Sequence, residues 1–507
     1  MSAPDAAALL DEVLALRSEV DAAVAERLVV WSATDLGGEA RASVENLARY
    51  LALRRHDLAD LQRRLARMGL SSLGRAEARV SAQLDAVAWA LAHLTGRPQD
   101  APAMPSEAVM WEGERVLATR TRQVFGPPPT DRRVRVVATL PSIAAEDPEF
   151  VRRLLAAGAD GVRINTAHDG PDAWRAMAAH AREAATDLRQ HVSIEVDLAG
   201  PKVRVAAGDR RRRHVGDAFW LVPPDAGPAA DASAPETDAA RDRIEVTLPS
   251  VLDTVAMGDA VWFDDGKLGG RVERLERAVD AGGEPRGTAV LVRVEHAVER
   301  GVRVRVEKGV NVPDTVIDVP VPTADDLAVL PEVLPFADAI GFSFVQRPSE
   351  VDALHDTIAA FGGGRAPALV LKIETRLAVR SLPALMVAAL RRGPTAVMIA
   401  RGDLAVELGF ERLAEIQEEL LWVCEAAHVP VIWATQVLEG MAKRGMPTRA
   451  EVTDAAMAER AEGVLLNKGP YAEAAVRSLA DVLRRMHRHQ SKKTARLGAL
   501  RAWDLEP

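Results

Sequence analysis

The 507-residue sequence has a single cysteine, no long apolar run and no excess of positive charge. Cys424 alone cannot form an internal disulfide, which is typical of a reducing compartment. No apolar stretch is long enough to cross a bilayer, and residues 1–5 do not form the basic start of a signal peptide. We therefore expect a cytoplasmic protein that has no membrane partner.

The charge balance also argues against a nucleic-acid partner. Lys and Arg number 64 and Asp and Glu number 73, which gives a formal net charge of -9. Proteins that bind a phosphate backbone concentrate positive charge on one face. Hydrophobic residues make up 48% and charged residues 27% of the chain, so we expect a globular protein, and its length suggests about three domains.

The first part of the chain has the apolar spacing of amphipathic helices. Apolar residues recur at three- and four-residue intervals in the runs 9–28, 47–65 and 84–94. The glycine and prolines at 126–129 cannot continue regular structure. We predict an all-helical N-terminal domain over residues 1–126. Its apolar faces could pack against the rest of the chain, join subunits or bind a partner, and packing is the simplest interpretation.

After residue 130, short β-branched runs alternate with amphipathic segments. The candidate strands are 134–140, 161–166, 192–198, 337–345, 368–373, 396–400, 429–434 and 463–466. Eight parallel strands that alternate with helices predict an α/β fold, a (β/α)₈ TIM barrel, over residues 130–201 and 308–490. Residues 202–307 contain strand-like pieces without a long helix, so we predict a small β domain inserted after the third strand. Residues 491–507 would form a C-terminal tail.

The chemistry of such a barrel lies at the carboxyl ends of its strands. There the fifth strand ends in Lys372-Ile373-Glu374, and Arg401-Gly402-Asp403 follows the sixth. Lys372 and Glu374 share a strand face, and Glu374 and Asp403 are hard oxygen donors that suit Mg²⁺ together with substrate oxygens. The alternative interpretation is a structural ion pair between Lys372 and Glu374.

Two further residues lie on the same rim. Glycine at 402 allows a ligand to approach the backbone, whose free N–H groups can bind a carboxylate or phosphate, although a lone glycine is by default a turn. Thr435 ends the seventh strand and offers a hydroxyl, although such a threonine more often bonds to the backbone.

Short segments along the chain occur in the same order as the motifs of a known protein family. The matching segments are Val137-Ala138-Thr139, Gly158-Ala159-Asp160-Gly161-Val162-Arg163-Ile164-Asn165, Asp197-Leu198-Ala199-Gly200-Pro201-Lys202-Val203-Arg204, Lys308-Gly309-Val310-Asn311-Val312-Pro313, Ser343-Phe344-Val345, Lys372-Ile373-Glu374, Ala400-Arg401-Gly402-Asp403-Leu404, Ala434-Thr435-Gln436-Val437-Leu438-Glu439 and Pro447-Thr448-Arg449-Ala450-Glu451-Val452. With these segments, residues 134–486 resemble pyruvate kinase. The inserted β domain also falls where that family carries its lid domain.

The resemblance implies a phosphotransferase that moves the phosphoryl group of phosphoenolpyruvate to ADP, giving pyruvate and ATP. Glu374 and Asp403 would bind Mg²⁺ or Mn²⁺. Lys372 and Arg163 would stabilise the transferring phosphoryl group, and Thr435 would lie beside the carbon that is reprotonated. Substrate would also contact the remaining rim residues, which are the backbone at Gly402, the Asp403 carboxylate and Ser343.

The resemblance also assigns the nucleotide end and a monovalent-cation position. Near the nucleotide would lie Asn165, His168, Arg204 and Lys308. Family members that need K⁺ bind it with an Asn, a Ser, an Asp and a carbonyl, but Ala167 replaces the serine here. Lys202 stands where those members carry a glutamate, so its ammonium is predicted to substitute for K⁺, which would then not be required.

Three departures from the family pattern bear on function. The eighth strand is followed by Asn467-Lys468-Gly469-Pro470 instead of the family's Ser-Gly-Glu-Thr motif, and Ala199 replaces a lysine of the third-strand motif. The chain ends soon after the last predicted barrel helix, so we expect no C-terminal effector domain. The alternatives are a phosphoenolpyruvate or pyruvate enzyme with another acceptor or with enolate carbon–carbon chemistry, and a non-catalytic phosphoenolpyruvate sensor. We expect a homo-oligomer.

Overall fold

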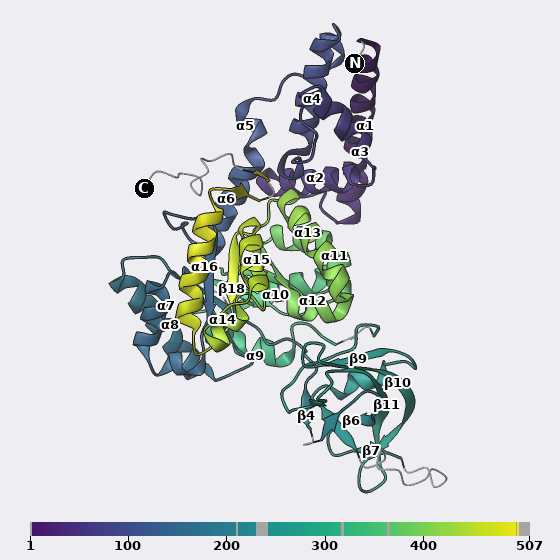
Figure 1. Cartoon of the computed structure of the whole chain (residues 1–507), viewed down its shortest axis with the longest axis vertical. Helices are drawn as coiled ribbons and strands as arrows, with labels where there is room; N and C mark the ends of the chain where they lie inside the picture. Colours follow the sequence, from purple (N-terminus) through teal and green to yellow (C-terminus); the bar gives the residue numbers. More distant parts are fainter. Residues whose placement is uncertain are drawn as a thin grey trace.

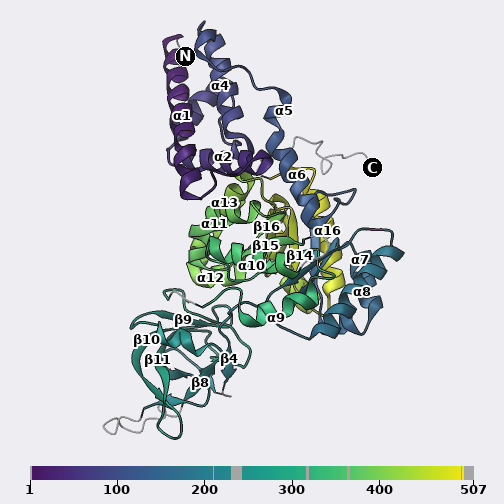
Figure 2. The same cartoon turned by 180° about the vertical axis from the view of Figure 1, so that it is seen from behind.

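The computed structural model describes residues 3–208, 211–229, 242–315, 319–361, 366–492 and 494–495. Three regions follow one another along the longest axis of the molecule: N-terminal helices, a central barrel and a β domain at the opposite end (Figures 1 and 2). Most of the predicted C-terminal tail, residues 491–507, lies outside the described residues. No helix in the described ranges is both long and apolar enough to cross a membrane.

The central region is a closed barrel of eight parallel strands, in the order β1-β18-β17-β16-β15-β14-β3-β2. The strands are β1 (Arg135–Thr139), β2 (Gly161–Asn165), β3 (Ser193–Asp197), β14 (Ala339–Phe342), β15 (Ala368–Ile373), β16 (Thr395–Ala400), β17 (Val431–Ala434) and β18 (Gly463–Leu466). Each begins and ends within three residues of its predicted bounds. The predicted (β/α)₈ fold is therefore confirmed.

Helices surround this barrel. They are α7 (Pro148–Ala156), α8 (Pro171–Asp187), α9 (Ala324–Val333), α10 (Pro348–Phe361), α11 (Arg376–Leu390), α12 (Arg401–Leu408), α13 (Phe410–Ala426), α14 (Glu439–Arg444), α15 (Arg449–Met457) and α16 (Ala472–Met486). The helix α9 contains Pro331, which has no backbone N–H to donate. A capping box between Thr323 and Asp326 stabilises its first turn, and Asp326 also accepts a hydrogen bond from the Gly200 N–H at 3.1 Å.

Alternation along the strands separates the barrel interior into an apolar and a charged level. On β15 the residues that share the inward face are Ala368, Val370 and Lys372, all buried. The first two belong to an apolar cluster that also contains Phe125, the last residue of α6 (Glu112–Phe125). The apolar residues thus fill the amino-terminal half of the barrel, and the charged side chains follow toward the carboxyl ends of the strands.

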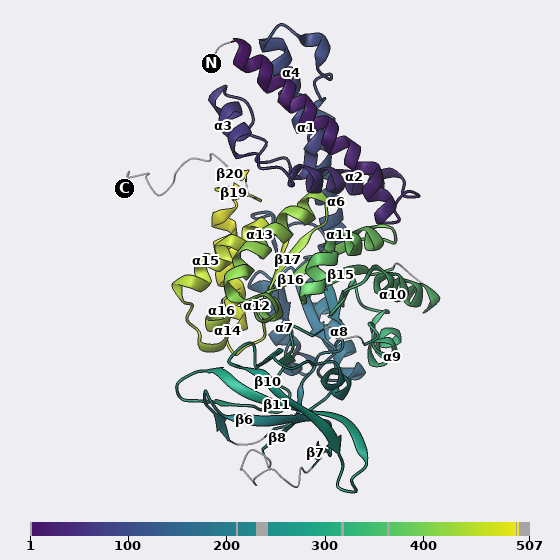
Figure 3. The same ribbon diagram turned by 90° about the vertical axis from the view of Figure 1, so that its right-hand side faces the viewer.

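The N-terminal region consists of helices, as predicted. They are α1 (Ala3–Val30), α2 (Gly38–Leu53), α3 (Ala59–Arg67), α4 (Val80–Leu94), α5 (Glu107–Met110) and α6. The apolar run 47–65 is divided between α2 and α3, because polar residues interrupt it and Asp57 accepts the Ala59 N–H at 3.0 Å before α3 begins. Figure 3 shows α2 lying across the end of the barrel beside α13.

Buried polar contacts join these helices to the barrel. The Asn46 amide of α2 donates to the Ala426 carbonyl at 2.8 Å and to the Glu77 carbonyl at 2.7 Å. The His428 ring lies 2.9 Å from Ser43 Oγ and 3.0 Å from the Ala78 carbonyl. Because unsatisfied polar groups are costly to bury, these matched partners favour the observed packing of the helices on the barrel.

The inserted region forms a largely antiparallel sheet in the order β13-β9-β10-β11-β6-β8-β4. Its strands are β4 (Val205–Ala207), β6 (Ala218–Val222), β8 (Arg243–Val246), β9 (Ala260–Phe263), β10 (Leu268–Val279), β11 (Pro285–Ala297) and β13 (Val310–Asn311). The chain enters this sheet after β3 and returns to the barrel before β14, so the predicted insertion after the third strand is confirmed. The insertion places its own residues opposite the carboxyl ends of the barrel strands.

Candidate active site

A single buried carboxylate contacts two cations at the carboxyl end of the barrel. Asp197, the last residue of β3, is fully buried. Its Oδ2 lies 2.7 Å from Arg163 Nη2 and 3.0 Å from Lys372 Nζ. Burial raises the pKa of Asp197, but the charges of Arg163 and Lys372 outweigh that effect and lower the pKa to about 2. Asp197 is therefore ionised and aligns both predicted catalytic cations.

Lys372 is bound from three directions. Its ammonium lies 2.6 Å from Ser343 Oγ and 3.4 Å from Glu374 Oε1, in addition to Asp197. The Ser343 hydroxyl in turn donates to the Leu198 carbonyl at 2.6 Å. Burial alone lowers the pKa of Lys372, yet the two carboxylates raise it above its ordinary value. The lysine is thus a permanently charged and well-oriented group.

The two predicted metal ligands follow neighbouring strands: Glu374 comes directly after β15, and Asp403 lies in the first turn of α12, after β16. Different groups contact them. Glu374 Oε2 accepts the Phe344 N–H at 2.7 Å, whereas Asp403 Oδ1 lies 2.8 Å from Lys202 Nζ and 3.5 Å from Asn311 Nδ2. Burial raises the pKa of Glu374, and Asp403 adds to this effect. Burial also raises the pKa of Asp403, but Lys202 overcomes this and lowers it.

These two carboxylates fit a divalent metal of the Mg²⁺ type. Both are oxygen donors: Glu374 is buried, the Asp403 side chain is 12% exposed, and Lys202 and Asn311 both contact Asp403 through Oδ1. Within those same ranges, no cluster of three or more His, Cys, Asp or Glu side chains has a metal-binding arrangement. Mg²⁺ commonly takes one or two carboxylates together with water and substrate oxygens, so a two-carboxylate site is sufficient for it.

Thr435 and Gly402, predicted on the same rim, contact each other. The Gly402 N–H donates to Thr435 Oγ1 at 2.7 Å, and Thr435 has a φ of 65°, in the left-handed region. Arg401 supports this conformation, because its Nη2 donates to the Thr435 carbonyl at 2.7 Å and its guanidinium lies over the Trp433 ring. The strained backbone at Thr435 thus directs the hydroxyl toward the start of α12.

On the other side of Arg163, a cavity of about 260 Å³ contains part of the predicted nucleotide end. Asn165 and His168 line it, together with Lys468 from the altered loop after β18. Burial lowers the pKa of His168, and the charges of Lys468 and Arg204 lower it further, so Arg204 belongs to the same surroundings. The cavity therefore combines a neutral imidazole with several cations.

Lys308 is not brought to this cavity. Its ammonium lies 2.8 Å from Asp264 Oδ1 in the inserted β domain, and its side chain is 41% exposed. Arg204 donates to the Glu307 carbonyl at 3.0 Å on the same domain. The four residues predicted near the nucleotide thus divide between the barrel rim and the inserted domain.

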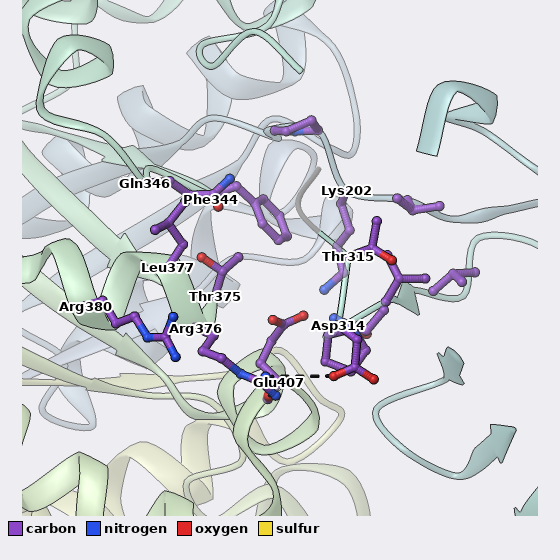
Figure 4. A pocket seen from close by; sticks show the side chains of 16 residues that line it. Lys202, Asp314, Thr315, Phe344, Gln346, Thr375, Arg376, Leu377, Arg380 and Glu407 are labelled. Carbon is purple, nitrogen blue, oxygen red and sulfur yellow. Dashed lines mark hydrogen bonds and ion pairs between the residues drawn. The ribbon is translucent and has the colours of Figure 1, made fainter. Parts of the chain in front are cut away.

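A second cavity, of about 220 Å³, separates the inserted domain from the barrel. Figure 4 shows Lys202 and Asp314 approaching it from one side and Phe344 and Arg376 from the other, with the Glu407 carboxyl between them. Burial raises the pKa of Glu407 to about 7. Lys202 therefore lies at the boundary between this cavity and the acidic pair.

Sequence reasoning did not assign three of the residues that shape the site. Asp197 was noted only as part of a matching segment, although its place at the end of β3 could have marked it as a rim residue. Asn311 and Lys468 come from the inserted domain and the altered loop. No sequence spacing relates those two residues to the barrel strands, so only the folded chain reveals them.

Comparison with known proteins agrees with this geometry. Residues 131–473 match the family model of the pyruvate kinase barrel domain. The chain is 34% identical over 339 residues to the pyruvate kinase of Methylorubrum extorquens, a match that covers 66% of this chain and 64% of that protein. It is 30% identical over 359 residues to the pyruvate kinase of Mycobacterium intracellulare, covering 69% of this chain and 70% of that protein.

The pyruvate kinase of Geobacillus stearothermophilus is also similar, with 30% identity over 358 residues. That match covers 69% of this chain and 56% of the relative, so the shared region spans between about half and 70% of these relatives' lengths. From the matched barrel and these relatives, the chain belongs to the pyruvate kinase family.

Proposed function

We propose that this protein transfers the phosphoryl group of phosphoenolpyruvate to ADP, giving pyruvate and ATP. The observation that carries the proposal is the convergence of Arg163 and Lys372 on Asp197, beside the carboxylates of Glu374 and Asp403. Phosphoryl transfer depends on positioning and on positive charge around the moving group. This arrangement supplies both.

Different site residues act on the phosphoryl end and on the enolate end of phosphoenolpyruvate. Arg163 and Lys372 neutralise the charge of the phosphoryl group, and Lys372 also stabilises the enolate oxygen as the bond to phosphorus breaks. Glu374 and Asp403 would bind the divalent cation, which when bound adds charge stabilisation at the substrate oxygens. The Thr435 hydroxyl, oriented by its contact with Gly402, would lie beside the enolate carbon that takes up a proton.

For the acceptor, the cavity beside Arg163 is the best candidate. It contains Asn165, His168 and Lys468, and positive charge there favours the phosphates of ADP. Lys468 supplies a cation in the loop that departs from the family motif, which supports phosphate binding by a different residue. The second candidate function is transfer of the phosphoryl group to an acceptor other than ADP. It is favoured by the loop after β18, which departs from the family motif on the acceptor side.

We further propose that the reaction does not require K⁺. Lys202 Nζ lies 2.8 Å from Asp403, and Asp403 and Glu374 raise the pKa of Lys202 against the lowering effect of burial. The ammonium is thus a permanent positive charge beside the acidic pair. Together with Ala167, which offers no hydroxyl ligand, this arrangement favours substitution of the monovalent cation by the lysine.

The direct test is an assay of pyruvate formed from phosphoenolpyruvate with Mg²⁺ or Mn²⁺ and each nucleoside diphosphate. Wild-type protein should release pyruvate with ADP, Lys372→Ala should lose this activity, and Lys267→Ala, which removes an exposed lysine of the inserted domain, should retain it. Turnover with another acceptor alone would favour the second candidate. Tight phosphoenolpyruvate binding without turnover by wild-type protein would support a sensor instead.

The homo-oligomeric state and the cytoplasmic location stay predictions. The proposed domain limits also stay predictions: a helical N-terminal domain of 1–126, a barrel of 130–201 and 308–490, an inserted β domain of 202–307 and a tail of 491–507. Size-exclusion chromatography with light scattering tests the first of these, and limited proteolysis tests the domain limits.

A further inference from the structure

Glu195 is a buried acid in the barrel interior that the proposed mechanism does not yet use. It lies two residues before Asp197 on β3, so both side chains face inward. In the register of β2 and β3, Glu195 pairs with Arg163. The exposed fraction of Glu195 is 4% and that of Asp197 is 0%. Glu195 therefore lies two residues closer than Asp197 to the amino-terminal end of the barrel, directly beneath the carboxylate that contacts Arg163 and Lys372.

Each of these two acids has one oxygen without a partner. Arg163 and Lys372 both contact Oδ2 of Asp197. Asp197 Oδ1 and Glu195 Oε1 are buried and accept no hydrogen bond from any residue that the structure describes. The Cβ of a larger residue at Gly341 would lie 2.0 Å from Asp197 Oδ1, so the backbone of β14 closes that side of the carboxylate. Such unsatisfied buried oxygens require a proton donor.

The donor is available within the pair itself. Glu195 and Asp197 are next to each other on the inward face of β3, and a side-chain hydrogen bond between them is among the causes that raise the pKa of Glu195. Burial and the neighbouring Asp197 charge raise the pKa of Glu195 to about 8, although Arg163 and Lys372 oppose this rise. The same two cations keep Asp197 ionised. Two adjacent buried carboxyl groups share one proton when they cannot both ionise, and here that proton belongs on Glu195.

We propose that Glu195 is a positioning residue: as a neutral carboxylic acid it donates a hydrogen bond to Asp197 and so orients the carboxylate that aligns Arg163 and Lys372. The proposal rests on the proposed function, since the aligned cations are those that would bind the phosphoryl group. With Glu195 neutral, the three other acids of the site (Asp197, Glu374 and Asp403) match three cations (Arg163, Lys202 and Lys372) in number.

Ionisation of Glu195 would disturb this arrangement. A second negative charge beside Asp197 would remove the hydrogen bond and compete for Arg163, its cross-strand neighbour. It would also add negative charge below the position of the phosphoryl group. The protein should therefore lose affinity for phosphoenolpyruvate as Glu195 releases its proton.

The test compares Glu195→Gln, which can still donate a hydrogen bond but cannot ionise, with Glu195→Ala, which can do neither. Glu183→Gln is the control, because it makes the same change of charge at an exposed position of α8. Two readouts are needed. The first is the infrared band of a protonated carboxylic acid, taken from difference spectra between wild type and each variant. The second is the affinity for phosphoenolpyruvate and kcat/KM, both as functions of pH.

At neutral pH the acid band should be present in wild type and absent from Glu195→Gln, and it should disappear as the pH rises through about 8. Glu195→Gln should match wild type at neutral pH and keep its affinity and kcat/KM at higher pH, where wild type weakens. Glu195→Ala should lose roughly ten- to a hundredfold in affinity, the cost of one hydrogen bond to a charged group. Glu183→Gln should change nothing.

The absence of an acid band, or identical pH profiles for wild type and Glu195→Gln, would overturn the proposal. If Glu195→Ala does not fold, the comparison of wild type with Glu195→Gln still tests the role of Glu195. Wild-type protein that binds phosphoenolpyruvate but forms no product would refute the proposed function. The infrared band and the pH dependence of binding would still test Glu195, so the two failures are distinguishable.

Discussion

Arg163 and Lys372 meet at one oxygen atom of Asp197. Oδ2 of that carboxylate lies 2.7 Å from Arg163 Nη2, 2.9 Å from Arg163 Nε and 3.0 Å from Lys372 Nζ. The three residues come from β2, β15 and β3, so the closed barrel is what brings them together. An ionised carboxylate beneath two cations aligns them toward the barrel opening and compensates their mutual repulsion when no substrate is bound.

Replacing Arg163 by lysine should impair catalysis although the charge is kept. The guanidinium contacts Asp197 through two nitrogens, a geometry that an ammonium cannot reproduce. We expect Arg163→Lys to reduce kcat/KM for phosphoenolpyruvate by roughly a hundredfold, which corresponds to about 3 kcal/mol. Steady-state kinetics measure the change, and Arg182→Lys, which alters a remote and largely exposed ion pair, is the control. Unchanged kcat/KM in Arg163→Lys would contradict the assigned role.

Activity should be independent of K⁺ as long as Lys202 is present. Its ammonium occupies the neighbourhood of Asp403 and Glu374 and supplies the positive charge there. We expect equal rates in K⁺ and in tetramethylammonium salts for wild type, and a large loss of activity in Lys202→Ala. Rates are compared at constant ionic strength. Strong activation of wild type by K⁺ that survives in Lys202→Ala would exclude the substitution.

Removing the Thr435 hydroxyl should slow protonation of the enolate. Thr435→Val loses the oxygen that accepts the Gly402 N–H, whereas Thr435→Ser retains it. Groups that transfer or orient a proton contribute typically a hundredfold or more, so we expect roughly that loss for valine and little loss for serine. Exchange of the pyruvate methyl protons with D₂O, followed by NMR, measures this step. Wild-type exchange rates in Thr435→Val would show that the hydroxyl plays no part.

Acid should destabilise the junction between the N-terminal helices and the barrel through His428. Burial, assisted by the nearby charge of Arg120, lowers the pKa of this imidazole to about 4. Between pH 6.5 and 4 the unfolded state binds a proton that the folded state does not, so stability falls as the pH decreases. The slope is at most about 1.4 kcal/mol per pH unit for one group.

Urea unfolding of wild type and His428→Asn at several pH values measures this effect. Asparagine tolerates the left-handed backbone at this position, where φ is 53°, but it does not titrate. The difference in the free energy of unfolding between the two proteins should change steadily from pH 6.5 to 4. A constant difference over that range would show that His428 does not titrate on unfolding.

Much of this structure could be predicted from local patterns. The barrel strands follow from short β-branched runs, and Lys372, Glu374 and Asp403 follow from their places at strand ends, because strand alternation and the barrel rule act over a few residues. The neighbourhood of Lys202 and Asp403 could not be predicted in the same way. These residues are 201 positions apart and belong to regions whose relative orientation no sequence period encodes.

Glu195 shows a second limit of sequence reasoning. A glutamate in a strand of apolar neighbours is compatible with an outward, solvated side chain as well as with an inward one. Its position in the barrel interior follows from the register of β2 and β3, which pairs it with Arg163. The pKa of Glu195, in turn, is raised by burial and by the charge of Asp197, and both depend on the packed barrel.

The most direct measurement of the central claim is the binding of phosphoenolpyruvate to Asp197→Asn by isothermal titration calorimetry in the presence of Mg²⁺, together with its turnover. Asp338→Asn is the matched control, because Asp338 also pairs with an arginine but lies just before the amino end of β14. If Asp197 aligns Arg163 and Lys372, its variant should lose both affinity and turnover by roughly a hundredfold while the control keeps them. Wild-type affinity and turnover in folded Asp197→Asn would contradict that claim.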